Sequence, residues 1–386
     1  MQFSGKPSNY PVTLEDLLRL TVEKKGSDLH IVSGIPPCIR IHGDLVRQEE
    51  LPAMAPEDVE NLLLQVISND QKRELETEWE LDLAVSVPGC ARFRGNVIVQ
   101  RNSIAAVFRA IPFSIPDLDK LGLPADVKRL CNLPRGLVLV TGPTGSGKST
   151  TLYATLAEIS TIEKNVITLE DPVERRMAGI NQVQMNTRAG MTFAAALRSV
   201  LRSDPDIVMV GEIRDSETAK IAVEAALTGH MVLSTLHTND APGAVTRLDE
   251  MGVEPFLTAS SLVGVLAQRL VRRLCPKCKE EYEISHEELK KIVPDLETYG
   301  YNQPSYKIYK AKGCLTCNNT GYKGREAVFE FLTVTEEMKR LILDRATITE
   351  VRDLAIEQEM KTLKDEGLYK MMEGATSLEE VLRVIV

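Results

Sequence analysis

The sequence predicts an α/β protein with more than one domain. At 386 residues the chain exceeds what a single hydrophobic core usually holds, and 43% hydrophobic with 26% charged residues is ordinary for a globular protein. From residue 135 onward, short β-branched segments alternate with longer helical ones, which is typical of a parallel sheet with helices on both faces. Earlier segments alternate with turn residues and favour a small α+β domain.

The first predicted domain, residues 1–111, combines one helix with several strands. Residues 14–26 place apolar side chains at helical spacing and end at Gly26, which predicts a helix with a glycine stop. The segments SDLHI and PCIRIHG, and the longer segment from Ala91 to Ala110, show partial alternation with a period of two. We therefore expect a small mixed α+β domain.

A proline-rich segment follows, and we predict an extended linker over residues 112–118, because proline disfavours helix in the residue before it. The next domain, residues 119–274, contains four expected strands in the segments GLVLVTG, NVITLE, DIVMVGE and MVLSTLHT. Residues 275–330 are expected to form a cysteine-containing lobe, and residues 331–386 a charged helical segment.

A glycine-rich segment lies between the first of these strands and a predicted helix. It fits the phosphate-binding pattern G-x-x-x-x-G-K-[ST] in the structural context that the pattern requires. Glycines let successive amide N–H groups point at a triphosphate, and the helix N-terminus adds positive potential. Lys148 is expected to reach the β- and γ-phosphates, and Ser149 to hold Mg²⁺. The expected nucleotide-binding residues are Gly142, Pro143, Thr144, Gly145, Ser146, Gly147, Lys148, Ser149 and Thr150.

Hydrolysis also needs a group that orients or deprotonates water. The segment DIVMVGE ends at Glu212, at the edge of the sheet where α/β proteins bind ligands, so Glu212 is the predicted base or water-positioning residue. Glu170, after another strand, is a second catalytic candidate, with a solvated acidic turn as the alternative. His230 and His237 flank the last strand on opposite faces of its expected path. We favour His237 for the γ-phosphate and keep His230 as a nucleotide-binding candidate.

Four of the seven cysteines form two Cys-x-x-Cys pairs, Cys275 with Cys278 and Cys314 with Cys317. Each pair presents two thiolates from a tight turn, and two pairs complete a tetrahedron around Zn²⁺. A site with four protein ligands is closed, so we expect structural zinc whose binding supplies folding free energy to this lobe. This use of cysteine indicates a metal site in a reducing compartment.

Bulk composition argues against two classes of partner. The net charge of -9 and the aromatic content of 5% do not suit a surface that binds nucleic acid by phosphate neutralisation and base stacking. The uncharged apolar segments are shorter than the ~20 residues that a membrane-spanning helix needs. We expect no nucleic-acid partner, and membrane contact only through other proteins.

These motifs together resemble the secretion ATPase superfamily (GspE, PilB and PilT types), the motors of type II secretion and type IV pilus systems. GPTGSGKSTT is similar to its Walker A loop, EDPVE to its Asp box, VMVGEIRD to its atypical Walker B motif and GHMVLSTLHTNDA to its His box. The resemblance implies a PAS-like N-terminal domain, a RecA-like ATPase core and a homo-hexameric ring with ATP between subunits. It also implies a cytoplasmic location beside an inner-membrane platform protein.

The same resemblance implies that arginines of the N-terminal domain reach the phosphates. The catalytic candidates are Arg94, Arg101 and Arg109. At least one of them should matter greatly, because an arginine finger raises turnover by about 10³ to 10⁵. Arg214 and Arg269 are lesser candidates for contacts between subunits or for a sensor role.

Different segments resemble different subfamilies. The segment GSDLHIVSGIPPCIRIHGDL is similar to pilus-retraction motors, whereas the cysteine pairs and CNNTGYKGREAVFEFL are similar to extension and secretion motors. EMKRLILDRA stands where retraction motors carry AIRNLIRE, so we predict pilus extension or type II secretion, with retraction as the alternative. A nucleic-acid translocase on a RecA core and a non-catalytic nucleotide-gated scaffold are further alternatives.

Overall fold

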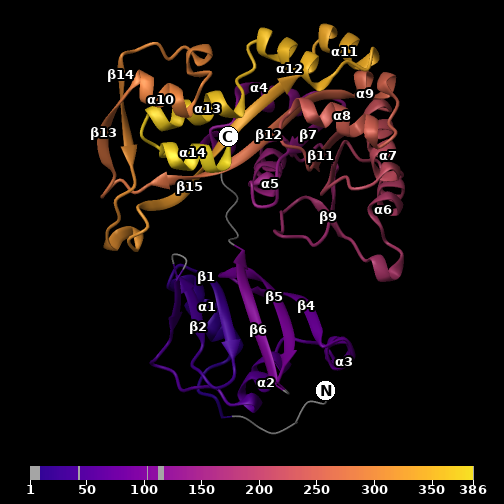
Figure 1. The fold of residues 1–386 in the computed structure, drawn as a ribbon. Coiled ribbons are helices and arrows are strands. Elements are labelled where there is room, and N and C mark those ends of the chain that lie inside the picture. Colours follow the sequence, from indigo (N-terminus) through magenta and orange to yellow (C-terminus); the bar gives the residue numbers. More distant parts are fainter. Residues whose placement is uncertain (1–8, 42–43, 102, 112–116, 386) are drawn as a thin grey trace. The chain divides into compact units, whose positions relative to one another are not determined.

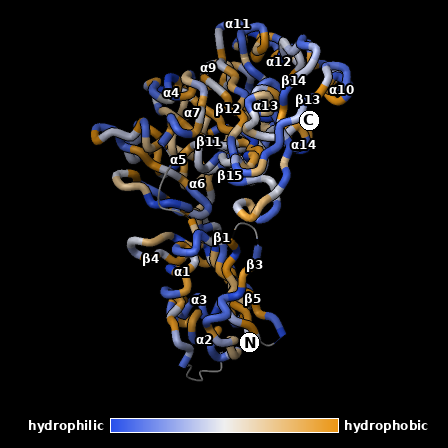
Figure 2. Tube along the Cα trace, turned by 90° about the vertical axis from the view of Figure 1, so that its left-hand side faces the viewer, coloured by the Kyte–Doolittle hydropathy of each residue, from blue (hydrophilic) through white to orange (hydrophobic). Residues whose placement is uncertain are grey.

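The computed structural model describes residues 9–41, 44–101, 103–111 and 117–385 (Figure 1). The chain divides into two compact units, one formed by residues up to 114 and one formed by most of the rest. Most of the predicted linker, residues 112–116, lies outside the described residues. Figure 2 shows hydrophobic and hydrophilic residues alternating along the chain in both units, as expected for helices and strands that bury one side.

The first unit is a six-stranded antiparallel sheet, in the order β3-β2-β1-β6-β5-β4, with helices packed against it. Its elements are α1 (Leu14–Glu23), β1 (Gly26–Val32), β2 (Cys38–Ile41), β3 (Asp44–Arg47), α2 (Pro56–Leu64), α3 (Asn69–Glu78), β4 (Glu80–Val87), β5 (Ala91–Gln100) and β6 (Ser103–Ile111). The segments predicted as strands from their alternation form β1, β2, β5 and β6. Phe93 and Phe108 lie fully buried in its core, so this unit has a hydrophobic core of its own.

Helix α1 ends before Gly26, and the glycine has a different role from the predicted helix stop. Lys25 takes the left-handed conformation with φ 55°, and Gly26 is the first residue of β1. A Cβ atom at Gly26 would lie 2.3 Å from Cγ2 of Ile39. The glycine is therefore required by the close approach of β2, a contact that no local pattern reveals.

The second unit is built on a seven-stranded sheet in the order β15-β12-β7-β11-β10-β8-β9. All its neighbouring strands run parallel except β15, which pairs antiparallel with β12. The elements up to β12 are η1 (Leu118–Leu121), α4 (Ala125–Cys131), β7 (Gly136–Thr141), α5 (Lys148–Ile159), β8 (Val166–Glu170), β9 (Asn181–Gln184), η2 (Thr187–Ala189), α6 (Phe193–Val200), β10 (Ile207–Val210), α7 (Ser216–Leu227), β11 (Met231–Leu236), α8 (Pro242–Glu250), α9 (Pro255–Ser261) and β12 (Leu262–Leu274).

The four segments predicted as buried strands form β7, β8, β10 and β11, and every residue of these strands is buried. Alternate side chains enter two separate cores. Leu137 and Leu139 pack with residues of α6, α7 and α8, whereas Val138 and Val140 pack with residues of α4 and α5. The sheet therefore has helices on both faces, as the sequence predicts.

The remaining elements form the cysteine-containing lobe and the C-terminal helices. They are β13 (Glu280–Ser285), α10 (His286–Ile292), η3 (Leu296–Tyr299), β14 (Ser305–Lys310), η4 (Leu315–Cys317), β15 (Tyr322–Thr333), α11 (Glu336–Leu343), α12 (Ile348–Glu357), α13 (Leu363–Met372) and α14 (Leu378–Val384). The predicted lobe boundary at residue 330 falls inside β15, which belongs to the central sheet.

The C-terminal helices divide between two neighbours. Residues of α11 and α12, such as Met338 and Val351, belong to the core of the sheet, whereas Leu368 of α13 and Val381 of α14 share a core with Ile308 of the lobe. Figure 1 shows α13 and α14 beside α10 and the antiparallel pair β13 and β14. In the described part of the chain, every helix is too short or too polar to cross a bilayer.

Candidate nucleotide site and metal centre

The glycine-rich loop joins the carboxyl end of β7 to the start of α5. Gly142, Gly145 and Gly147 have φ values of 139°, 80° and 94°, which L-amino acids rarely adopt. A Cβ atom at Gly142 would lie 2.4 Å from the carbonyl oxygen of Gln268, and one at Gly147 would lie 2.6 Å from Nε2 of the same residue. The loop conformation therefore depends on glycine, and the loop packs directly against β12.

Gln268 links this loop to its surroundings, and sequence reasoning missed it. Its side chain is buried, its Nε2 donates to the carbonyl oxygen of Ser146 at 2.7 Å, and its Oε1 accepts from Oγ1 of Thr151 at 2.7 Å. One amide thus joins the loop, α5 and β12. Gln268 lies 122 residues after Ser146, so no local pattern connects the two residues. The one feature of the sequence that could have indicated its role is a polar residue inside the apolar segment of β12.

The charged and hydroxyl groups of the loop fit an anionic ligand. Lys148 Nζ donates to the carbonyl oxygens of Gly142 (2.8 Å) and Pro143 (3.0 Å). Burial lowers the pKa of Lys148, and nearby Arg269 adds to the shift while Glu212 opposes it. Ser146 Oγ is buried without a hydrogen-bond partner among the described residues. A buried hydroxyl and a partly desolvated ammonium group beside a helix N-terminus suit phosphate oxygens.

The rest of the predicted loop set lies where solutes can reach it. Thr144 and Gly145 are exposed, as is Pro143, and their backbone lies at the open side of the loop. Ser149 is exposed and Thr150 is half-buried in the first turn of α5. Backbone N–H groups in the first turn of a helix have no partner within the helix, so this turn adds donors to the site.

Glu212 and His237 lie at the same edge of the sheet as the loop, because they follow the parallel strands β10 and β11. The side chain of Glu212 is 17% exposed, with Oε1 2.6 Å from Nη2 of Arg214 and Oε2 3.4 Å from Nε2 of His237. Hydrogen bonding and charge from Glu212 raise the pKa of Arg214. The structure therefore brings a carboxylate, an imidazole and a guanidinium group together beside Lys148.

Glu170 lies at the end of β8 and is buried, so a solvated acidic turn does not describe it. Its carboxylate accepts hydrogen bonds from Oγ1 of Thr168 at 2.5 Å, from Nε2 of Gln182 at 3.0 Å and from the hydroxyl of Tyr153. These partners belong to β8, β9 and α5. The carboxylate joins three elements that support the loop.

His230 lies at the other end of β11, away from the loop. Its Nδ1 is 2.9 Å from the carbonyl oxygen of Ala225, and its own carbonyl oxygen accepts from the backbone N–H of Gly136. Gly136 begins β7, whereas the loop follows the last residue of that strand. The structure therefore does not bring His230 to the loop of its own chain.

The three predicted arginines lie in the first unit, on or next to β5 and β6. Arg94 is 3.9 Å from Asp82, and Nε of Arg109 is 2.8 Å from Oδ1 of Asp28. Arg101 follows β5 with a φ of 45°, is exposed, and has no partner within the described part of the chain. In the second unit, Arg269 donates from Nη2 to the carbonyl oxygen of Asn239 at 2.7 Å.

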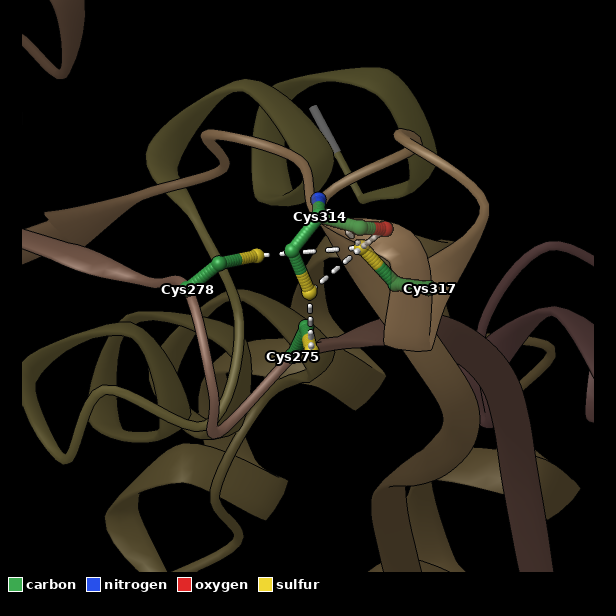
Figure 3. Close-up of side chains that lie close together, drawn as sticks. All are labelled: Cys275, Cys278, Cys314 and Cys317. Atoms are coloured by element: carbon green, nitrogen blue, oxygen red, sulfur yellow. Dashed lines mark hydrogen bonds between the residues drawn. The ribbon is translucent and has the colours of Figure 1, made fainter.

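The four cysteines of the two pairs converge on one point (Figure 3). The sulfur atoms are separated by 3.9 Å between Cys275 and Cys314, 3.7 Å between Cys278 and Cys317, and 3.7 Å between Cys314 and Cys317. A tetrahedron with Zn–S bonds of about 2.3 Å has edges of about 3.8 Å. The residues present therefore fit a structural zinc ion.

Backbone donors around one sulfur favour the thiolate form that binds metal. The N–H groups of Cys314 and Gly321 each lie 3.2 Å from Sγ of Cys317. Burial raises the pKa of Cys317, but these hydrogen bonds outweigh it and bring the value to about 6. Donors of this kind orient the ligands of a metal centre and tune their charge.

Comparison with known proteins gives consistent matches. Residues 81–383 match the family model described as type II/IV secretion system protein. The type IV pilus assembly ATPase PilB of Thermus thermophilus is 53% identical over 273 residues, which cover 69% of this chain and 30% of the relative. The type II secretion system ATPase E of Vibrio cholerae is 53% identical over 272 residues, which cover 69% of this chain and 53% of the relative.

A solved structure extends the similarity to both units. The crystal structure of the pilus retraction motor PilT with bound ADP superimposes with a TM-score of 0.77 at 30% identity and covers 96% of each chain. By contrast, the alignments with the two curated relatives span about half of those proteins or less.

Proposed function

This chain belongs to the family of type II/IV secretion system proteins, and we propose that it hydrolyses ATP to drive a type IV pilus assembly or type II secretion machine. The observation that carries the proposal is the meeting of Lys148, Glu212 and His237 at one sheet edge, directly beside a loop whose conformation requires glycine. A phosphate-binding loop next to an anchored carboxylate is the minimum that hydrolysis of a phosphoanhydride needs.

The residues divide the work in the following way. The amides of the loop and Lys148 bind the phosphates, and the oxygen atoms of Ser149 and Glu212 suit Mg²⁺, a hard cation that neutralises phosphate charge when bound. Glu212 orients the attacking water, and its position is set by Arg214 on one oxygen and His237 beside the other. Glu170 supports the loop indirectly, because it accepts a hydrogen bond from Tyr153 of α5, the helix that follows the loop.

The proposal includes assembly into a homo-hexameric ring with ATP between subunits. In this arrangement an arginine of the first unit reaches the phosphates bound by a neighbouring chain. Arg101 is favoured over Arg94 and Arg109, because its guanidinium is exposed and unpaired among the described residues, whereas the other two face Asp82 and Asp28. The ring works at the cytoplasmic face of the inner membrane through a platform protein.

Pilus assembly or type II secretion is favoured over retraction. The pilus assembly and secretion ATPases are 53% identical over 69% of this chain, whereas the retraction motor is 30% identical over 96% of it. The tetracysteine cluster agrees with this choice. Retraction is kept as the second candidate because the retraction motor matches 96% of both chains, the first unit included.

The test is phosphate release by the purified protein with and without Lys148→Ala. We expect turnover to fall by about 100-fold or more, since a charge aimed at the reacting phosphate is removed. Circular dichroism should show an intact fold, because the side chain donates only to two loop carbonyls. Lys220→Ala, at an exposed position on α7, is the matched control and should keep full activity. Normal hydrolysis by Lys148→Ala would refute the assignment.

A further inference from the structure

The loop that follows β11, residues 237–241, carries His237 and is held by side chains from three later elements. Arg269 of β12 donates to the carbonyl oxygen of Asn239 at 2.7 Å. Arg352 of α12 donates to Oδ2 of Asp240 at 2.6 Å. Glu330 of β15 accepts from the backbone N–H of Ala241 at 2.7 Å. The position of His237 therefore depends on residues far beyond it in the sequence.

Glu330 differs from the other two because it is buried and serves two partners. Its side chain is 4% exposed, and while Oε1 accepts from Ala241, Oε2 accepts from the backbone N–H of Leu363 at 3.2 Å. Ala241 precedes α8 and Leu363 begins α13. A single carboxylate thus accepts from the N-termini of two helices, where negative charge is favoured.

Burying a carboxylate is costly, and here the cost is only partly offset. Burial raises the pKa of Glu330 although both backbone N–H groups act against the shift. An apolar residue would fill the same place in the sheet without that penalty. The carboxylate instead gives the backbone N–H groups of Ala241 and Leu363 an acceptor, which an apolar side chain could not supply.

We propose that Glu330 is a positioning residue that locks the His237 loop onto the N-terminus of α13. The proposal rests on the function proposed above, because it assigns Glu330 a part in placing His237 beside Glu212. It also predicts that Glu330 and α13 connect the His237 loop to the lobe. Leu368 and Met371 of α13 pack in the hydrophobic core that this helix shares with the lobe.

The test is Glu330→Gln, which keeps the shape of the side chain. An amide has one oxygen, so one of the two backbone N–H groups loses its acceptor and faces an NH₂ group instead. We expect kcat for ATP hydrolysis to fall by about tenfold to 100-fold, the effect of a misplaced catalytic group. The KM for ATP should change less than about twofold, because the hydrogen bonds of Glu330 within the described residues go to Ala241 and Leu363 and not to the glycine-rich loop.

Glu380→Gln is the matched control. Glu380 is also a buried carboxylate in the second unit, but the hydrogen bonds that its carboxylate accepts within the described residues come from Arg272, its backbone N–H included, and from Arg383, and not from the His237 loop. Its variant should melt at a lower temperature yet keep kcat. Equal loss of kcat in both variants would overturn the proposal, since it would point to general destabilisation.

A double-mutant cycle with His237→Ala tests whether Glu330 acts through the loop. If it does, Glu330→Gln should have less than about a twofold effect once His237 has been removed. Effects on kcat that multiply would overturn the positioning role. A wild-type protein that does not hydrolyse ATP would instead refute the proposed function. Failure of the proposed function can therefore be distinguished from failure of the role proposed for Glu330.

Hydrogen exchange provides a readout that does not depend on turnover. Amides in residues 237–241 should exchange faster in Glu330→Gln than in the wild type and in Glu380→Gln, and unchanged exchange would overturn the proposal. If Glu330→Gln fails to fold, Arg352→Met tests the same loop from α12, since it removes the hydrogen bond to Asp240. That variant should show the same pattern of lower kcat, unchanged KM and faster local exchange.

Discussion

At the scale of single residues, the side-chain amide of Gln268 fixes the glycine-rich loop to its surroundings. The amide is satisfied at both ends, by the Ser146 carbonyl and the Thr151 hydroxyl. Neither partner has access to bulk water at that point, because both Ser146 and Thr151 are buried. Removing the amide would therefore leave two buried polar groups without partners.

We predict that Gln268→Leu lowers the free energy of unfolding by about 1 to 3 kcal/mol and weakens ATP binding. The cause is a loop that is no longer fixed against β12. Urea unfolding and nucleotide titration measure the two effects. Gln358→Leu, at an exposed position directly after α12, serves as the control, and unaltered nucleotide affinity in Gln268→Leu would contradict this account.

The ion pairs of Glu380 should make a pH-dependent contribution to the stability of the fold. Burial alone would raise its pKa, but hydrogen bonds from Arg383 and Arg272 outweigh burial and lower the pKa from 4.5 to about 2. A carboxylate with a depressed pKa stabilises the fold fully above pH 4.5, and this contribution is lost as the pH falls toward 2.

We predict that the wild type is more stable than Glu380→Gln at pH 7 and that the difference disappears between pH 4.5 and about 2. Other carboxylates also titrate in this window, so the informative quantity is the difference between the two proteins. Denaturant unfolding at a series of pH values measures it. A stability difference that persists at pH 2 would show that packing, and not charge, is responsible.

At the scale of elements, the metal-binding lobe and the last two helices form one body. The pair β13 and β14 contributes Ile308 to a core that also contains Leu289 of α10, Leu368 of α13 and Val381 of α14. The four cysteines of the two pairs lie in the same lobe, with their sulfur atoms close together. The lobe thus combines four cysteines that fit zinc with a hydrophobic core that α13 and α14 complete.

We predict one zinc ion per chain and loss of order in the lobe when it is removed. Structural zinc contributes apparent binding free energies of about 10 to 16 kcal/mol, so a strong chelator or Cys314→Ser should expose β13 and β14 to proteolysis. Because α13 and α14 share this core, they should lose hydrogen-exchange protection as well. Cys90→Ser is the control, since Cys90 lies outside the cluster. Protection that is indifferent to the metal would contradict the structural role.

At the scale of the whole molecule, the proposed ring assigns parts of one active site to two chains. The glycine-rich loop and Glu212 belong to the second unit, and Arg101 belongs to the first. If Arg101 acts on a neighbour's nucleotide, a chain that lacks Lys148 remains able to supply Arg101 to an adjacent chain.

We predict that Lys148→Ala and Arg101→Ala are each nearly inactive alone, with the arginine contributing about 10³ or more to turnover. When the two are mixed and assembled, sites with an intact loop beside an intact arginine should recover a measurable part of wild-type phosphate release. Mixing Lys148→Ala with Glu212→Gln is the control, because both changes affect the same unit of the chain. A mixture as inactive as its parts would argue against arginine supply between chains.

Much of the fold and site was predictable because its signals are local. The four buried strands are short β-branched segments, and the loop is recognised from its own eight residues between a strand and a helix. Glu212 and His237 follow from their positions directly after strands, since parallel strands bring their carboxyl ends to one edge. The cysteine pairs likewise carry their ligand geometry in their spacing.

Other features depended on contacts between distant segments. The alternation rule places His230 and His237 on opposite faces of a strand, but both lie outside β11, at opposite ends of it. Gly26 resembles a helix stop, yet glycine is required there because β2 approaches too closely for a side chain. The strand β15 joined the central sheet although the cysteines before it suggested a separate lobe.

The sequence by itself therefore determined which groups form the candidate sites: a glycine-rich loop, an acid at the sheet edge and four cysteines that fit zinc. Only the tertiary structure decided which residues hold these groups in place, namely Gln268 behind the loop and Glu330 between two helix N-termini. The physical reason is that periodicity and motif spacing encode interactions within a segment, whereas the partners of a buried polar group are set by strand register and packing across the whole sheet.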